Sequence, residues 1–192
     1  MSTQRVTAIL VVHDGTTWLP EVVTSLATQT RSADRIMAVD TGSLDASAKL
    51  LKGARIPTIS LDREIGFGEA VSLAVDKLPE TVDHDWIWLI HDDCAPDAYA
   101  LKELLAALDE RPAVAMAGPK LRGWHDRNHL LELGISIASN GARWTGLEYR
   151  EADQGQHDGV SEVLAVSTAG ALIRRDVFEE LDGFDPELSL FR

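Results

Sequence analysis

Residues 6–12 have the sequence VTAILVV, and this short apolar run decides how the rest of the chain is interpreted. Its length is that of one strand, and its nearly continuous apolar character is typical of a strand buried on both faces. Such strands occur in parallel sheets whose two faces are covered by helices. We therefore expect this run to be the first strand of an α/β fold.

Strand-like and helix-like segments alternate along the chain as far as residue 118. Further strands are expected at 35–40, 58–61, 86–90 and 113–117, and apolar positions at helical spacing predict helices at 18–26, 45–52, 67–78 and 98–108. This alternation implies right-handed crossovers between parallel strands. The sequence therefore predicts a three-layer α/β/α sandwich with a mainly parallel sheet.

The pattern is less regular after residue 118. Residues 122–161 are rich in Gly, Asp, Asn, Arg and His, with a hairpin expected around 132–144. A regular pattern is expected again at 163–173, followed by a helix over 175–181. Because no linker or repeat interrupts the chain, we expect a single domain spanning residues 1–192.

Composition excludes several classes of protein. The 192 residues carry 18 Lys and Arg against 31 Asp and Glu, a formal charge of −13, which would repel nucleic acid. The single cysteine, Cys94, rules out an internal disulfide and a CxxC site. No stretch approaches the roughly 18 apolar residues that a membrane span needs, and the N-terminus lacks a signal-peptide pattern. We expect a cytoplasmic domain that binds no nucleic acid.

Acidic residues and histidines follow the expected strands. Because parallel strands place their carboxyl ends at one edge of a sheet, these side chains should lie near one another. Clustered carboxylates favour Mg²⁺ or Mn²⁺, although each Asp could instead form a turn or cap a helix. The residues are His13 and Asp14 after the first strand, Asp40 after the second, Asp62 after the third, and His91, Asp92 and Asp93 after the fourth.

Two other features could contact a ligand. Gly66-Phe67-Gly68 opens an expected helix, where free N–H groups could meet a phosphate or ribose, or where the glycines could simply allow tight packing. Val71 stands where a dinucleotide-binding motif has its third glycine, so that motif is not present. Trp124 and Trp144 have indole rings that suit stacking on sugars as well as core packing.

Five segments occur in a characteristic order along the chain. They are VVHDG at 11–15, VDTGSLDAS at 39–47, GFGEA at 66–70, WLIHDDCAPD at 88–97, and GALIRR at 170–175 followed by GFDP at 183–186. This series resembles the motifs of inverting family 2 glycosyltransferases of the GT-A fold. The resemblance spans essentially the whole chain, and its second segment is the most specific.

The resemblance implies metal-assisted transfer of a sugar, a hexose or deoxyhexose, from a nucleotide-diphosphate donor to a hydroxyl acceptor with inversion. A UDP- or TDP-linked donor, a saccharide or lipid-linked acceptor and a role in bacterial cell-wall or polysaccharide biosynthesis are expected. It also implies a nucleotide-binding half at 1–118 and an acceptor-side half at 119–192. The implied donor-binding residues are Val12, His13, Asp14, Asp40, Gly42, Ser43, Gly66, Phe67, Gly68 and Asp92, and the implied ligands of Mg²⁺ or Mn²⁺ are Asp93 and His91.

The chain departs from the family pattern at three places. His91 stands where many relatives have an Asp, and Glu64 and Ser72 replace two frequent asparagines. The acidic pair that supplies the general base would lie beyond Arg192, so we expect an N-terminal fragment of the catalytic domain, in which transfer is weak or absent, taken from a larger, membrane-associated protein. The alternative is a non-catalytic nucleotide-binding module on the same scaffold.

Overall fold

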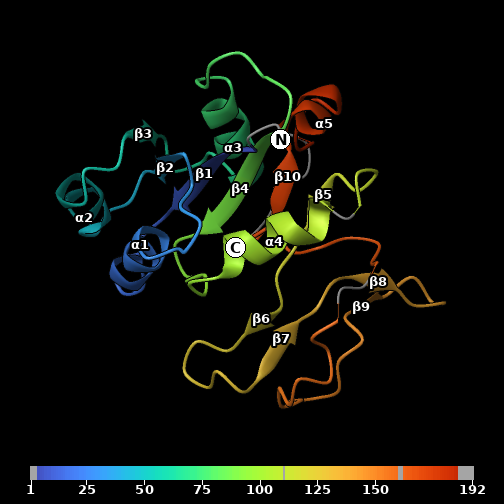
Figure 1. Cartoon of the computed structure of the whole chain (residues 1–192). Helices are drawn as coiled ribbons and strands as arrows, with labels where there is room; N and C mark the ends of the chain where they lie inside the picture. Colours follow the sequence, from blue (N-terminus) through green and yellow to red (C-terminus); the bar gives the residue numbers. More distant parts are fainter. Residues whose placement is uncertain (1–3, 110, 160–161, 186–192) are drawn as a thin grey trace.

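A computed structural model describes residues 4–109, 111–159 and 162–185. Its centre is a six-stranded sheet with the order β3-β2-β1-β4-β10-β5 (Figure 1). The strands of this sheet are β1 (Arg5–Val12), β2 (Arg35–Thr41), β3 (Thr58–Leu61), β4 (Asp85–His91), β5 (Met116–Ala117) and β10 (Leu172–Arg174). The helices are α1 (Leu19–Ala27), α2 (Ser47–Gly53), α3 (Phe67–Val75), α4 (Ala100–Asp109) and α5 (Arg175–Glu180).

Strand β1 lies at the centre of the fold, as its apolar sequence predicts. It pairs in parallel with β2 on one side and β4 on the other, and β2 pairs in parallel with β3. Alternate β1 residues point to opposite faces: Leu10 packs with residues of α1, α2 and α4, whereas Ile9 packs with residues of α3 and α5. The predicted three-layer sandwich is therefore confirmed.

The helices cover both faces of the sheet. Figure 1 shows α3 and α5 above the sheet and α1 and α4 below it. Each helix presents an apolar stripe to the strands, such as Leu19, Val22 and Leu26 of α1. None of the helices in the three described stretches is long and apolar enough to cross a membrane.

The later part of the sheet differs from the expectation. The strand expected at 113–117 is reduced to two residues of β5, and from the ordered segment expected at 163–173 only the start of β10 enters this sheet. Strand β10 runs antiparallel to both β4 and β5. The physical reason is that a long irregular excursion precedes β10, so no helical crossover forces a parallel direction.

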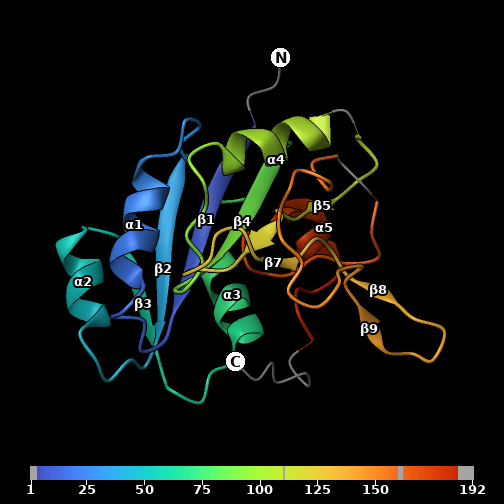
Figure 2. The same ribbon diagram turned by 90° about the horizontal axis from the view of Figure 1, so that it is seen from below.

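The excursion forms a small lobe, which we define as residues 120–159 and 162–166. It contains two short antiparallel pairs, β6 (Leu121–Arg122) with β7 (Leu130–Glu132), and β8 (Ser136–Ile137) with β9 (Arg143–Trp144). The second pair confirms the expected hairpin, and both views show it projecting away from the central sheet (Figures 1 and 2). Trp124 joins the lobe to α1 by packing edge-on to Trp18, with ring centroids 4.9 Å apart.

Because the centre of β1 is buried, we can predict how a substitution there changes the free energy of unfolding. Leu10 is fully buried, so Leu10→Ala should lower the free energy of unfolding by about 2–5 kcal/mol, because it removes apolar contacts and leaves a cavity. Leu164, which is 67% exposed, is the matched control, and Leu164→Ala should cost less than about 0.5 kcal/mol. Urea unfolding measures both, and equal costs would contradict the central position of β1.

Candidate functional site

The candidate site lies at the edge of the sheet where β1, β2 and β4 end. The strand register pairs Val12 with Asp40 and Val11 with His91, so the polar residues after these strands start from neighbouring positions. In open α/β sheets this edge is where ligands bind. The structure therefore brings together the ends of β1, β2 and β4.

Asp92 is packed against the segment that follows β1. Its Oδ2 accepts a hydrogen bond of 2.6 Å from the backbone N–H of His13. A Cβ atom on Gly15 would lie only 2.7 Å from the same oxygen, so any larger residue at this position would displace the carboxyl group. Glycine at position 15 thus allows the loop after β1 to close over Asp92.

The surroundings of Asp92 make its charge costly. Burial raises the pKa of this carboxyl group to about 7, and the negative charge of Asp93 adds to the shift. Asp45 and Asp14 contribute in the same direction. Near neutral pH, Asp92 is therefore divided between its protonated and ionised forms, and a nearby cation would favour the ionised form.

The segment 39–47 wraps around the end of β1. Asp14 Oδ1 accepts the backbone N–H of Leu44 at 2.7 Å, and Ser43 Oγ accepts the backbone N–H of Asp14 at 3.0 Å. The backbone N–H of Ser43 in turn donates to Oδ1 of Asp40, which is buried. These bonds fix the two strand ends relative to each other and explain why polar residues occur in this pattern.

Arg63 is a site residue that sequence reasoning missed. It follows β3 and donates to Asp14 Oδ2 at 2.6 Å and to the carbonyl oxygen of Gly42 at 3.0 Å. Gly42 has a positive φ of 70°, and a Cβ there would lie 2.9 Å from the backbone nitrogen of Arg63. The Arg63 hydrogen bond lowers the pKa of Asp14, which keeps this carboxylate ionised. No motif marks a single arginine in a loop, so no sequence signal could have identified it.

His91 is held between the sheet and the segment that leads into β10. Its Nε2 lies 2.9 Å from Oγ1 of Thr168, another residue that the sequence did not suggest. Its ring also contacts Phe67, with centroids 4.6 Å apart. Burial lowers the pKa of His91, so the imidazole is neutral near pH 7. The ring is therefore oriented by contacts on two sides.

The Gly66-Phe67-Gly68 segment serves two purposes. Gly68 is needed for packing, because a Cβ there would lie 2.8 Å from Cβ of Phe184. Gly66 has open space where a side chain would be, and it stands at the N-terminus of α3. The packing alternative thus explains Gly68, whereas Gly66 leaves the start of the helix accessible.

The acidic edge fits a divalent cation that is shared with a phosphate ligand. Among the residues that the structure describes, no group of three or more His, Cys, Asp or Glu is placed to hold a metal ion. Mg²⁺, however, is usually bound by one or two carboxylates together with substrate phosphates. Asp93 is exposed beside the half-buried Asp92, which gives such a carboxylate pair. Asp62, the remaining acidic residue of the expected group, lies just after β3, and its backbone carbonyl oxygen accepts the N–H of Ile65 at 3.2 Å.

Comparison with known proteins identifies relatives over nearly the whole chain. Residues 7–182 match the sequence model of the family described as glycosyl transferase family 2. The O-antigen chain rhamnosyltransferase RfbN of Salmonella typhimurium is 27% identical over 183 residues, which are 94% of this chain and 55% of the relative. The galactofuranosyltransferase GlfT1 of Mycolicibacterium smegmatis is 24% identical over 192 residues, 98% of this chain and 62% of the relative. The chain thus spans little more than half the length of these relatives.

Solved structures share the fold. TarS of S. aureus, residues 1–349 in complex with UDP, has a TM-score of 0.62 at 15% identity and matches 97% of this chain and 52% of its own. The mannosyltransferase PcManGT of Pyrobaculum calidifontis, in complex with GDP-Man and Mn²⁺, has a TM-score of 0.67 at 13% identity and matches 97% of this chain and 49% of its own. These likenesses confirm the GT-A fold.

The raised pKa of Asp92 predicts a pH-dependent stability. Because this pKa lies above the ordinary 3.8, the folded chain binds an extra proton between about pH 4 and pH 7, and the free energy of unfolding falls as the pH rises through this window. Asp92→Asn cannot lose a proton there. In EDTA, raising the pH from about 4.5 to about 8 should therefore destabilise the wild type relative to the variant, on the order of 1–2 kcal/mol after solvent screening.

Urea unfolding of both proteins at each pH gives this difference. Curves of stability against pH that run parallel for the wild type and Asp92→Asn would show that Asp92 titrates normally.

Proposed function

The chain belongs to glycosyl transferase family 2, and on this premise we propose that it transfers a sugar from a nucleotide-diphosphate donor to a hydroxyl acceptor with inversion at the anomeric carbon. The observation that carries the proposal is the convergence of His13, Asp40 and Asp92 at one edge of the sheet. That edge combines backbone groups, the buried carboxyl group of Asp40, the half-buried one of Asp92 and an accessible helix N-terminus. Each of these suits a different part of a nucleotide diphosphate.

The ends of β1 and β2 would bind the base and ribose. The residues proposed for this role are Val12, His13, Asp14, Asp40, Gly42 and Ser43. Support comes from their rigidity, because Asp14 and Asp40 are both held by backbone N–H groups of the segment 39–47. His13 Nδ1 lies 3.0 Å from both the carbonyl oxygen and Oγ1 of Thr41, which orients its ring.

The donor sugar and diphosphate would lie between Asp92 and the N-terminus of α3. Gly66, Phe67 and Gly68 form that N-terminus, where Gly66 leaves space for a ligand. The helix dipole and the free N–H groups of the first turn favour negative charge. Asp92 would accept hydrogen bonds from ribose or sugar hydroxyl groups once it is ionised.

Mg²⁺ or Mn²⁺ would be held by Asp93 and His91. When bound, such an ion stabilises the negative charge that develops on the diphosphate leaving group. Asp93 is exposed and free to bind in this way. His91 is neutral, as a metal ligand must be, but it would have to use Nδ1 or give up the contact of Nε2 with Thr168.

The names of relatives guide the proposed substrates. They include a rhamnosyltransferase and a galactofuranosyltransferase, and one structural neighbour is bound to UDP. We favour a UDP- or TDP-linked hexose or deoxyhexose, a saccharide or lipid-linked acceptor, and a cytoplasmic role in bacterial cell-wall or polysaccharide synthesis. Donor binding is the step to test on this chain.

Thermal unfolding with UDP, TDP and GDP, each with Mn²⁺ or with EDTA, tests donor binding. A ligand at about 100 times its dissociation constant adds roughly 2.7 kcal/mol, or about 5–10 °C for a chain of this size. We expect such a shift with UDP or TDP in Mn²⁺ and a smaller one in EDTA. Asp93→Ala should remove the benefit of Mn²⁺, because the exposed carboxylate is the proposed ligand.

Asp83→Ala is the matched control, since Asp83 is an exposed carboxylate just before β4, at the opposite edge of the sheet. It should keep the full Mn²⁺-dependent shift. The proposal fails if no nucleoside diphosphate stabilises the chain, or if NAD or S-adenosylmethionine does so in their place.

A further inference from the structure

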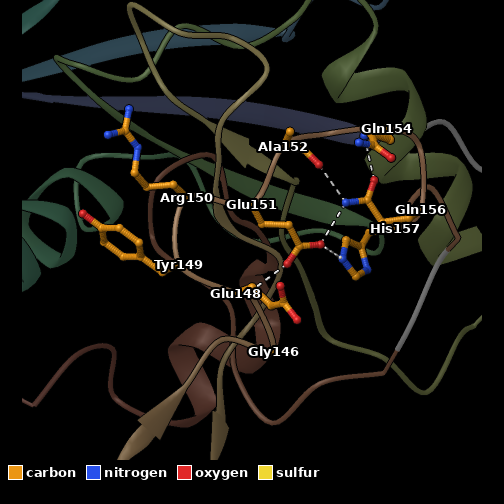
Figure 3. A pocket seen from close by; sticks show the side chains of 9 residues that line it. All are labelled: Gly146, Glu148, Tyr149, Arg150, Glu151, Ala152, Gln154, Gln156 and His157. Carbon is orange, nitrogen blue, oxygen red and sulfur yellow. Dashed lines mark hydrogen bonds and ion pairs between the residues drawn. The ribbon is translucent and has the colours of Figure 1, made fainter.

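The lobe contains a groove that the proposed donor site does not use. A cavity of about 590 Å³ lies between residues 146 and 157 (Figure 3). A second cavity of about 190 Å³ reaches Trp144 and Val163. The two cavities share Gly146 and His157 and are therefore adjacent, and we call them together the lobe groove.

Two exposed aromatic rings line the lobe groove. Tyr149 is 94% exposed in the larger cavity, and Trp144 is 58% exposed in the smaller one. Rings that served only to pack the lobe would be buried, as Trp88 is in the central sheet. Aromatic faces flanked by polar groups are surfaces on which the C–H faces of sugars stack.

The polar wall of the groove is built around Glu151. Its carboxylate accepts hydrogen bonds from Gln156 Nε2 and His157 Nε2, both at 2.8 Å, and from the backbone N–H of Glu148 at 2.9 Å. These hydrogen bonds lower the pKa of Glu151 to about 2, so it is ionised. Figure 3 shows this network on one side of the chain and the side chains of Tyr149 and Arg150 extending to the other side.

The charge of the groove selects the kind of sugar. Glu148 and Glu151 both line the larger cavity, and the whole chain carries a formal charge of −13. Carboxylates accept hydrogen bonds from hydroxyl groups but repel phosphates and uronic acids. Arg150 offsets one of the two carboxylates. An uncharged saccharide can donate hydrogen bonds to the carboxylates, accept them from the arginine, and stack on the aromatic rings.

The lobe is also tied to the candidate donor site. Trp124 packs on Trp18, whose backbone N–H donates to the carbonyl oxygen of Gly15, beside Asp92. Thr168, which follows the lobe, contacts His91. These two contacts connect the two ends of the lobe to the edge where the donor would lie.

We propose that the lobe groove binds an uncharged saccharide, with Tyr149 and Trp144 as stacking platforms, and that this saccharide is part of the acceptor. The inference rests on the proposed function for its biological meaning. The binding itself can be tested without any sugar transfer.

Saturation-transfer NMR and tryptophan fluorescence with methyl α-rhamnopyranoside, methyl β-galactofuranoside and glucuronic acid test the proposal on this chain. The two uncharged glycosides should bind in the millimolar range and glucuronic acid much more weakly. Tyr149→Ala and Trp144→Ala should each weaken binding about five- to tenfold, the range expected for loss of an aromatic contact. Tyr149→Phe keeps the ring and should bind as the wild type does.

Tyr99→Ala is the matched control, because Tyr99 is 54% exposed and lies outside the lobe. It should leave saccharide binding unchanged. Failure of both uncharged glycosides to bind, equal binding by Tyr149→Ala and the wild type, or tighter binding of glucuronic acid would overturn the proposal.

The nucleotide shift separates this inference from the proposed function. Tyr149→Ala should retain the full stabilisation by UDP or TDP with Mn²⁺. Nucleotide binding without saccharide binding would refute the lobe groove alone, whereas saccharide binding without nucleotide binding would refute the donor site alone.

Discussion

Burial of β1 on both faces is the constraint on which the rest of the structure depends. Seven of its eight residues are buried, and alternate residues belong to different core clusters. Helices must therefore cover both sides of the sheet, and polar groups are confined to the ends of the strand. His13 and Asp14 stand at the first positions after β1 where a charged or hydrogen-bonding side chain is tolerated. The candidate site thus lies at the ends of the strands because helices cover both faces of the sheet.

The packing that buries β1 also determines the charges of the carboxyl groups at the site. Asp92 is carried by the end of β4 into contact with the backbone after β1, where water cannot fully solvate it. Its carboxyl group is then poised between two protonation states by burial and by neighbouring carboxylates. Asp14 has the opposite environment, since Arg63 and a backbone N–H hold it ionised. Two carboxyl groups within one short edge thus differ in charge because one faces a cation and the other does not.

Much of this arrangement was predictable from the sequence because it depends on local patterns. The apolar run at 6–12 predicts a central strand, and the polar residues after each strand predict where a site forms. Arg63, Thr168 and the antiparallel direction of β10 were not predictable in this way. They depend on loops that reach the site from distant parts of the chain, and no spacing in the sequence encodes where such loops end. The roles given to His91 and Asp93 rest on a family resemblance and stay predictions.

The charge distribution suggests how one acidic chain could handle two different ligands. A nucleotide diphosphate is repelled by carboxylates unless a cation or helix N-termini offset them, and on the proposed function both would act at the edge of the sheet, near Asp93 and Gly66. The lobe groove has two glutamates, Glu148 and Glu151, against the single Arg150, so on the proposed inference it favours hydroxyl groups over phosphates. On the proposed function, the donor and acceptor would therefore be kept apart by electrostatics as well as by shape. The negative charge of the chain, which first argues against an anionic substrate, would then restrict the donor to that edge.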